Sequence, residues 1–373
     1  MDVRPVVTRA DRKSFVRFPW RIYPGSYPAW VPPLLTEERK RIDPERNPFF
    51  LHGEAALFLA YSDGKPVGRI AAIENRQHNE FHADRVGFFG FFESVDDPEV
   101  AGALLDEAAA WVRGRGLTSL RGPTNFSTNE ECGLLVENFE EAPYVMMTYN
   151  PPYYPALLEG WGLAKVKDLV AYEVTYADFD QERLAVIERL VSRRNIDSRI
   201  RSLDMKRFDE EVELVRDLYN AAWERNWGFV PMTDAEVDHM AKQLKPVVDR
   251  DLVLFAEIGG EPAGFALALP DINQALRHAN GRLFPVGLVR LLWHMRRING
   301  IRILTLGLKE EFRRTGLAGQ LYSEIFRRGA AKGHTRAESS WILEDNHLMR
   351  TALEKMSFRQ SKTYRIYERA LAS

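Results

Sequence analysis

The sequence predicts a mixed α/β fold, built as two copies of one unit that follow each other along the chain. Two hairpin-like segments, each a β-rich run, a Gly-containing turn and a second β-rich run, place Gly64 and Gly260 at equivalent positions. The same spacing separates Asn150 from Asn346, and each of these opens a helix-like stretch. A shared spacing at two distant landmarks indicates a duplication, with two unrelated α/β domains as the alternative. The length of 373 residues suits two ordinary domains.

The elements of the two copies follow the same order. The first copy, residues 1–180, contains a hairpin, a central segment, a polar loop, a helix and an alternating strand, at 55–73, 90–111, 121–143, 150–163 and 168–176. The second copy, residues 181–373, contains a hairpin, an additional segment, a buried strand, a helix, a second helix and a last strand, at 252–269, 281–298, 301–308, 317–328, 346–358 and 362–370. The copies therefore differ by the polar loop of the first and the additional segment of the second, where function is often added.

Composition and charge exclude several classes of protein. The chain is 45% hydrophobic and 28% charged, which is typical of globular proteins, and its formal net charge of −2 disfavours a nucleic-acid binder. Cys132 is the one cysteine, so neither an intrachain disulfide nor a cysteine-based zinc site is expected, and no HExxH spacing predicts another metal site. The N-terminus lacks the apolar stretch of a secretory signal, and no apolar run is long enough to span a bilayer. We expect a cytoplasmic protein.

The pattern R-x-x-G-x-A stands between the strand 301–308 and the helix 317–328. A glycine at a strand-to-helix junction exposes consecutive backbone N–H groups, and the helix N-terminus adds partial positive charge. Arg313 and Arg314 add formal charge, while Gly316 and Ala318 allow close approach of an anion to the backbone. The segment therefore predicts a cradle for a pyrophosphate. Its expected members are Arg313, Arg314, Thr315, Gly316, Leu317, Ala318 and Gly319.

This motif resembles the acyl-CoA-binding motif of the GNAT superfamily of N-acyltransferases, [RQ]-x-x-G-x-[GA]. The resemblance implies acyl-CoA as cosubstrate, and a strand at 306–309 that splays from its neighbour and pairs with pantetheine. It also implies that a backbone N–H of Leu308 or Lys309 polarises the thioester, and that Asn346 opens the next family helix. The family's usual helix tyrosine is replaced by Leu353, which leaves the general acid open among Tyr364, Tyr367 and water. Core packing is the alternative role of both tyrosines.

The first copy lacks the motif. Asp96, Asp97 and Glu99 stand where phosphates would bind, and their charge would repel them, so we expect one CoA site per chain. The first copy instead carries the polar loop, whose densest run extends from Asn125 to Glu131. We expect this loop on the acceptor side, with a surface loop rich in Asx and Ser/Thr turns as the alternative.

Candidate catalytic residues come from both copies. Acyl transfer to an amine needs a base that takes the amine proton. The candidate bases are Glu131 in the polar loop, Glu338 on the strand after the central helix, Glu310 at the turn, and the histidines His52, His78 and His82. Asn125 in the loop and Tyr364 on the last strand are the other catalytic candidates. For every candidate outside the polar loop, the alternative is a purely structural role.

The whole chain resembles a group of tandem GNAT-like bacterial proteins. It shares with them the phrases GFFGFFE, GPTNFST, ECGLLVE and NPPYY, at 87–93, 122–128, 131–137 and 150–154. Some members resemble the bacterial ceramide synthases, which implies an N-acyltransferase that moves a long acyl group from CoA to a sphingoid amine. The alternatives are a FemX-like transferase that uses aminoacyl-tRNA and a non-catalytic acyl-CoA-binding protein.

The additional segment of the second copy has the pattern of a basic amphipathic helix, which suggests a membrane as a partner. Within 283–298, Leu288, Leu291 and Leu292 recur at helical spacing among Arg and His side chains, with Trp293 beside them. A basic, aromatic amphipathic helix can lie on an anionic membrane, and packing on the other domain is the alternative. We expect an amine acceptor with lipid character and peripheral contact with the inner face of the membrane. The sequence leaves the oligomeric state open.

Overall fold

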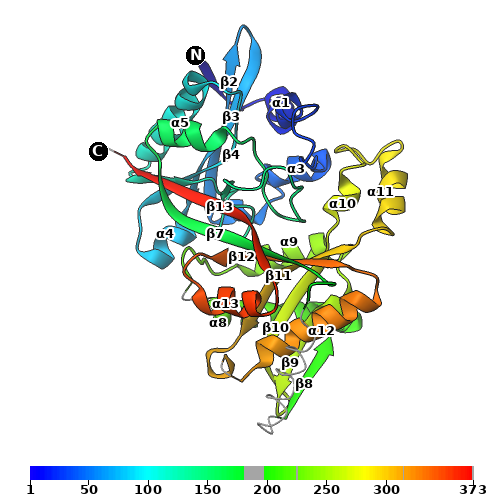
Figure 1. The fold of residues 1–373 in the computed structure, drawn as a ribbon. Coiled ribbons are helices and arrows are strands. Elements are labelled where there is room, and N and C mark those ends of the chain that lie inside the picture. The colour runs from blue at the N-terminus through cyan, green and yellow to red at the C-terminus, as the bar shows by residue number, and fades with distance from the viewer. Residues whose placement is uncertain (180–196, 224–225, 314, 372–373) are drawn as a thin grey trace. The chain divides into compact units, whose positions relative to one another are not determined.

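The computed structural model describes residues 1–179, 197–223, 226–313 and 315–371 (Figure 1). The chain divides into two compact units. Unit 1 comprises Met1–Leu169, Ala275–His294 and Lys362–Ser373, and unit 2 comprises Val170–Gln274 and Met295–Ser361. Each unit is built on a mixed sheet with helices, so the mixed α/β fold class is confirmed.

The sheet of unit 1 has the strand order β1-β2-β3-β4-β5-β13. Its neighbours are antiparallel except β4 and β5, which are parallel, and the short β6 pairs with β13. The strands are β1 Asp2–Pro5, β2 Gly53–Ser62, β3 Lys65–Asn75, β4 Val86–Ser94, β5 Ser119–Gly122, β6 Leu134–Leu135 and β13 Arg359–Ala370. The helices are α1 Arg9–Arg17, α2 Pro19–Ile22, α3 Leu35–Arg41, η1 Pro48–Leu51, α4 Arg76–His82, α5 Pro98–Arg113 and α6 Tyr154–Gly160.

Helix α5 shows why these residues fold as they do. Its apolar side chains recur at helical spacing, and Leu104, Leu105, Ala108 and Val112 are fully buried in one cluster with the sheet. The carboxylate of its N-cap, Asp97, accepts a hydrogen bond from the N–H of Glu99 at 2.8 Å. The helix is thus fixed by burial along one face and by a side-chain cap at its start.

The sheet of unit 2 has the strand order β7-β12-β11-β10-β9-β8. Strands β8 to β11 are antiparallel neighbours, and β11 and β12 are parallel. The strands are β7 Ala164–Thr175, of which residues 170–175 belong to unit 2, β8 Ser198–Ser202, β9 Val253–Ile258, β10 Glu261–Pro270, β11 Gly300–Leu308 and β12 Arg336–Leu343. The helices are η2 Met205–Arg207, α8 Phe208–Trp223, α9 Asp234–Leu244, η3 Arg250–Leu252, η4 Glu310–Phe312, α12 Leu317–Ala331 and α13 His347–Lys355.

The expected elements of both halves occur in matching order. The hairpins β2–β3 and β9–β10 place Gly64 and Gly260 in their turns, and a parallel strand–helix–strand segment follows in each half. Asn150 precedes α6, and Asn346 is the N-cap of α13. The order of elements therefore agrees with a duplication.

The compact units do not coincide with the halves 1–180 and 181–373. Strand β13, from the end of the chain, pairs with β5 and β6 in unit 1, whereas β7, from the first half, lies next to β12 in unit 2. The segment 275–294, which contains most of α11 (Gly287–Met295), also belongs to unit 1, and the short α10 (Asn273–Leu276) leads into it. Each sheet is therefore completed by a strand from the other half of the chain.

Candidate functional site

Strands β11 and β12 pair over only part of their length. Parallel pairing begins at Gly300 and Arg336 and ends at Ile303 and Ser339, although β11 continues to Leu308. On its other edge, β11 stays paired with β10 up to Leu308, and a register shift at Leu267/Ala268 marks a β-bulge, which bends a strand. Beyond Ile303, β11 thus has a backbone edge that is not paired with β12, and we call this unpaired stretch the opening. This is the splay that the GNAT resemblance implies.

The N–H groups of Leu308 and Lys309 have different directions. The N–H of Lys309 donates to the carbonyl of Ala263 at 2.9 Å, so it is already used within the sheet. Successive residues of a strand direct their N–H groups to opposite edges, which turns the N–H of Leu308 toward the opening. Of the two expected donors to a thioester carbonyl, the geometry favours Leu308 and gives Lys309 a structural bond.

A strand-to-helix turn follows β11. Gly316 is the N-cap of α12 and has φ of 95°, a left-handed conformation that favours glycine. The hydroxyl of Thr315 donates to the carbonyl of Phe312 at 2.6 Å and accepts the N–H of Leu317 at 3.4 Å. The bond from the N–H of Gln320 to the carbonyl of Gly316 begins the helix, so helix geometry leaves the N–H groups of residues 317–319 directed outward. The N–H groups of Ala318 and Gly319 thus have no partner within the helix, as the predicted anion cradle requires, whereas the N–H of Leu317 makes a long bond to Thr315.

Of the two arginines of the motif, the structure describes only Arg313. Arg313 donates from its guanidinium to the carbonyl of Ala222 at 2.9 Å, at the end of α8, and its side chain is exposed. This bond holds the turn against α8. A carbonyl has no formal charge, so the bond does not neutralise the positive charge of Arg313. Arg314 lies outside the described residues.

The first half of the chain has the same splay, but its own loop fills it. Pairing of β4 with β5 ends at Phe88 and Arg121. Beyond this point, the N–H of Phe91 donates to Oδ1 of Asn125 at 2.7 Å, and the N–H of Thr124 donates to the carbonyl of Phe89 at 2.8 Å. The cap of α5 by Asp97 occupies the position that Gly316 has in α12. The splay of the first half is therefore occupied by the chain's own loop, and its lack of a CoA site stays a prediction.

Asn125 and Glu131, expected in the acceptor loop, are brought together. Nδ2 of Asn125 donates to Oε2 of Glu131 at 3.1 Å, and Arg41 of α3 donates to the same oxygen at 2.7 Å. Arg41 also pairs with Glu130 at 3.3 Å and Glu38 at 3.6 Å. Burial raises the pKa of Glu38 against the opposing effect of Arg41. Burial would lower the pKa of Arg41, but Glu131, Glu130 and Glu38 raise it. The loop is thus tied to α3 by a dense charge cluster that the sequence did not reveal.

Glu338 and Tyr364, the other catalytic candidates, are fully buried. Glu338 lies on β12 in unit 2, where Oε1 accepts from the hydroxyl of Ser340 at 2.6 Å. The same hydroxyl accepts from Nε of the fully buried Arg302 at 2.9 Å. Tyr364 lies on β13 in unit 1, opposite Leu135. Glu310 lies in η4 and is exposed. Sequence reasoning missed Arg302; its signal was a single charge within a buried strand, in register with Glu338.

The helix that begins at Asn346 has a structural cap and an apolar core position. Oδ1 of Asn346 accepts the N–H of Met349 at 3.2 Å, as an N-cap does. Leu353 is fully buried, so the helix carries no hydroxyl at the position of the family tyrosine. Sequence reasoning also missed Tyr172 of β7, whose hydroxyl accepts from Arg350 and donates to Glu354 of this helix, both at 3.0 Å.

His78 differs from the expected base. It is 2% exposed on α4, and burial together with His82 and Arg121 lowers its pKa to about 3. It therefore stays neutral at physiological pH and is not a base that titrates near neutrality.

Acid should unfold the chain in part through His78. Its pKa is about 3 in the folded state and 6.5 unfolded, so the unfolded state binds the extra proton as the pH falls from 6.5 to 3. Protonation of His78 in the unfolded state therefore lowers the free energy of unfolding as the pH falls below 6.5. This loss reaches on the order of 4 kcal/mol at pH 3. Urea unfolding of wild type and His78→Gln across this range should show a flatter acid limb in the variant. Equal slopes would contradict the assignment.

The described residues offer neither a cluster of metal ligands nor a membrane-spanning helix. Within these ranges, no group of three or more His, Cys, Asp or Glu side chains is arranged to hold a metal ion. Over the same part of the chain, no helix is long and apolar enough to cross a membrane.

Comparison with known proteins identifies relatives over the whole chain. No protein-family model matches it. It is 39% identical over 384 aligned residues to the bacterial ceramide synthase of Caulobacter vibrioides, covering 100% of this chain and 98% of that protein. It is 35% identical to Protein YghO of Escherichia coli K12, covering 99% and 95% of the two chains.

The solved structure of a tandem GNAT protein from the clavulanic acid biosynthesis pathway covers 100% of this chain, with 99% of its own length aligned. The TM-score is 0.55 at 10% identity, so this likeness bears on the fold alone and confirms two tandem GNAT-like domains. With relatives aligned from end to end, the sequence similarity bears on the family. The chain therefore belongs to the family of the bacterial ceramide synthase, as an acyltransferase with a tandem GNAT fold.

Proposed function

We propose that the chain is an acyl-CoA-dependent N-acyltransferase that transfers a long-chain acyl group to the amine of a sphingoid base. The observation that carries the proposal is the splay of β11 from β12, followed by the left-handed Gly316 at the start of α12. The 39% identity with a protein named bacterial ceramide synthase supports the substrate class, because it extends over the full length of both chains.

The residues of unit 2 suit acyl-CoA. Outward N–H groups at a helix N-terminus bind phosphate oxygens, which assigns the pyrophosphate to residues 317–319. The free edge of β11 suits the amides of pantetheine, because an extended peptide-like chain can pair with a strand edge. The N–H of Leu308 would then donate to the thioester oxygen, on which negative charge develops during attack by the amine.

An assay with both substrates tests this proposal. Purified protein is incubated with palmitoyl-CoA and sphinganine, thiol release is followed by absorbance, and the lipid product by mass spectrometry. We expect thiol release that requires the amine and yields one amide per thiol. Thiol release without amine would indicate a thioesterase, and CoA binding without release under any amine would indicate a binding protein. Activity only with aminoacyl-tRNA would favour the FemX-like alternative.

A further inference from the structure

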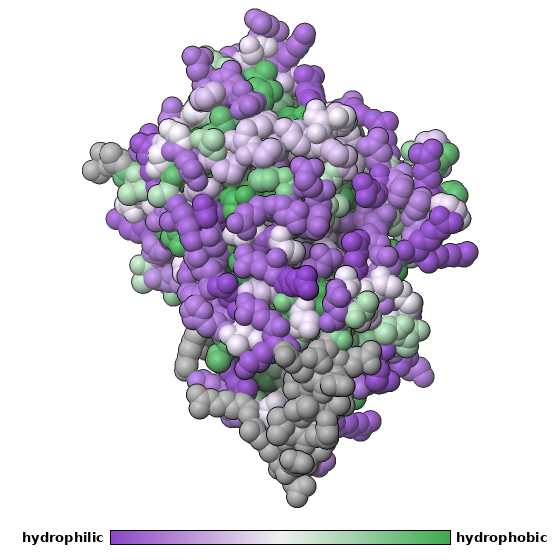
Figure 2. Space-filling view, viewed as in Figure 1, coloured by the Kyte–Doolittle hydropathy of each residue, from purple (hydrophilic) through white to green (hydrophobic). Residues whose placement is uncertain are grey.

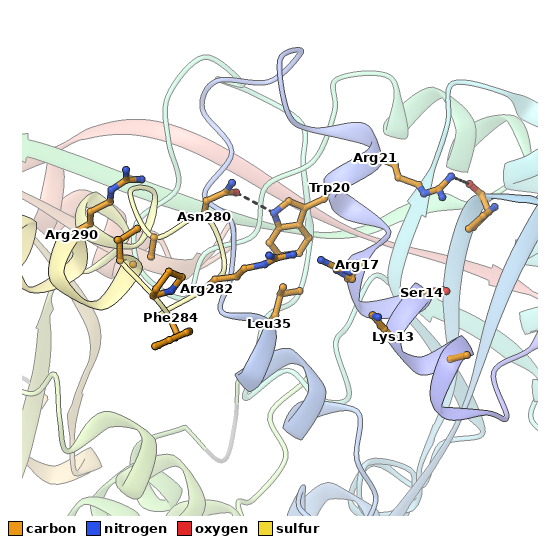
Figure 3. Close-up of a pocket in the computed structure, with 16 residues that line it drawn as sticks. Lys13, Ser14, Arg17, Trp20, Arg21, Leu35, Asn280, Arg282, Phe284 and Arg290 are labelled. Carbon is orange, nitrogen blue, oxygen red and sulfur yellow. Dashed lines mark hydrogen bonds between the residues drawn. The ribbon is translucent and has the colours of Figure 1, made fainter.

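The segment 275–294 is fixed on the N-terminal part of unit 1. The indole N–H of Trp20 donates to Oδ1 of Asn280 at 3.1 Å (Figure 3). The backbone N–H of Leu35 donates to the carbonyl of Gly281 at 3.0 Å. Gly281 has φ of 74°, and a Cβ there would lie 2.4 Å from Cζ2 of Trp20. These contacts fix the base of the segment, so the position of its exposed side within unit 1 is built into the fold.

The exposed side of this segment is strongly apolar. Thirteen large hydrophobic side chains are exposed in the described part of the chain, and six of them lie between residues 284 and 293. They are Phe284 at 88%, Val289 at 69%, Leu292 at 55%, Val286 at 54%, Trp293 at 51% and Leu288 at 47% exposure. We call these six residues the apolar patch. In Figure 2, hydrophobic atoms at the right, where Figure 1 places α11, lie among hydrophilic side chains. Exposed clusters of this kind mark interaction sites.

A basic cavity of about 880 Å³ adjoins the apolar patch, since Phe284 and Val286 line both. Five cationic side chains line it: Lys13, Arg17, Arg21, Arg282 and Arg290 (Figure 3). Among the described residues, its lining includes no Asp or Glu. Arg21 donates to the carbonyl of Pro66 at 3.5 Å, a weak bond that leaves its charge uncompensated. Positive charge here is therefore concentrated and available to an anionic partner.

A second cavity of about 880 Å³ extends this positive surface along α1. Arg9, Arg12, Lys13 and Arg39 line it, with Asp43 as its one carboxylate among the described lining residues. Lys13 and Ala10 line both cavities. The cations of α1 thus continue the basic surface beyond the first cavity, and Val7, which is 71% exposed, lies among them.

We propose that the apolar patch and the basic cavity form a docking surface for an anionic phospholipid membrane. The apolar side chains enter the boundary of the acyl region, as an interfacial amphipathic helix does, and the cations bind headgroup phosphates. Charge complementarity favours a membrane as the partner of this surface. An apolar protein partner would leave the five cations of the cavity facing apolar surface. A phospholipid membrane offers acyl chains to the apolar patch and phosphates to the basic cavity. The proposal stands independently of the acyl acceptor, because it concerns unit 1 and not the opening beside β11.

Vesicle sedimentation with the full chain tests the proposal. Sucrose-loaded vesicles of phosphatidylglycerol mixed with phosphatidylcholine should pellet the protein, and phosphatidylcholine alone should pellet it far less. The double variant Val289→Glu with Leu292→Glu should bind the anionic vesicles at least about tenfold more weakly, because it places charge where acyl chains lie. Leu51→Glu is the matched control, since Leu51 is 76% exposed in unit 1 outside the patch. It should bind like wild type.

The cavity requires its own variant. Arg17→Glu with Arg282→Glu should also weaken binding to anionic vesicles about tenfold, and should remove most of its salt dependence, because surface lysines and arginines each add attraction to anionic lipid. Melting temperatures close to wild type would show that both double variants fold. Equal pelleting by wild type and both variants would overturn the proposal, as would pelleting independent of phosphatidylglycerol. Light scattering tests a second copy of the chain as the partner. If wild type is a dimer that does not bind vesicles, and Val289→Glu with Leu292→Glu makes it monomeric, the apolar patch is a dimer interface and the membrane proposal is wrong.

Discussion

Replacing Gly316 with Glu is expected to lower the affinity of the chain for CoA by at least about a hundredfold, with turnover lost in parallel. Two causes add. A side chain at φ of 95° costs on the order of 1–2 kcal/mol in backbone strain, and a carboxylate in the cradle repels a pyrophosphate. Calorimetric titration with CoA measures the effect directly.

Two further variants separate these causes and guard against misfolding. Gly316→Ala carries the strain without the charge and should weaken binding less than Gly316→Glu. Gly102→Glu makes the same chemical change in α5 of unit 1, where a Cβ meets no atom within 4 Å, and should leave CoA affinity unchanged. Wild-type affinity in Gly316→Glu would remove the start of α12 from the site.

Replacing both Asn125 and Glu131 with Ala is expected to lower turnover by about a hundredfold while CoA affinity stays the same. The motivation is their geometry: Asn125 is bonded to the N–H of Phe91 and to Glu131, which Arg41 holds in turn. These bonds hold the amide and the carboxylate in one orientation. That the loop serves the acceptor remains our prediction, and it rests on the proposed function.

Kinetics with varied amine distinguish this role from a purely structural one. A higher KM for the amine or a lower kcat, with CoA titration unchanged and the variant folded, supports the assignment. Glu140→Ala, an exposed glutamate in the same loop, is the control and should behave like wild type. If the folded double variant turns over like wild type, the loop is only part of the surface. If it fails to fold, Asn125→Asp and Glu131→Gln, which keep the shape of each side chain, replace it.

Local features of the fold could be predicted from the sequence because short-range chemistry decides them. The turns at Gly64 and Gly260 and the junction at Gly316 all have positive φ. The exchange of β7 and β13 between the sheets could not be predicted. Both strands alternate in the same way and follow equivalent helices, so either could pair beside β5 or β12, and only long-range packing selects the partner.

The site was predictable where a motif directs backbone groups and not where side chains meet. R-x-x-G-x-A located the turn before α12, whereas the bond that occupies the N–H of Lys309 depends on the register with β10. The bond from Phe91 to Asn125 joins residues 34 positions apart. The sequence of a polar loop does not show whether the loop is exposed or folded against a strand. His78 offers a similar case, since burial, the largest cause of its low pKa, depends on packing and not on the local sequence.

A crystal structure of the chain with CoA tests the central claim most directly. We predict one CoA per chain, in unit 2, with pyrophosphate at the N–H groups of Leu317, Ala318 and Gly319 and pantetheine along the free edge of β11 beyond Ile303. CoA held instead between β4 and β5, where Asn125 now bonds to Phe91, would contradict the account, as would CoA bound away from α12.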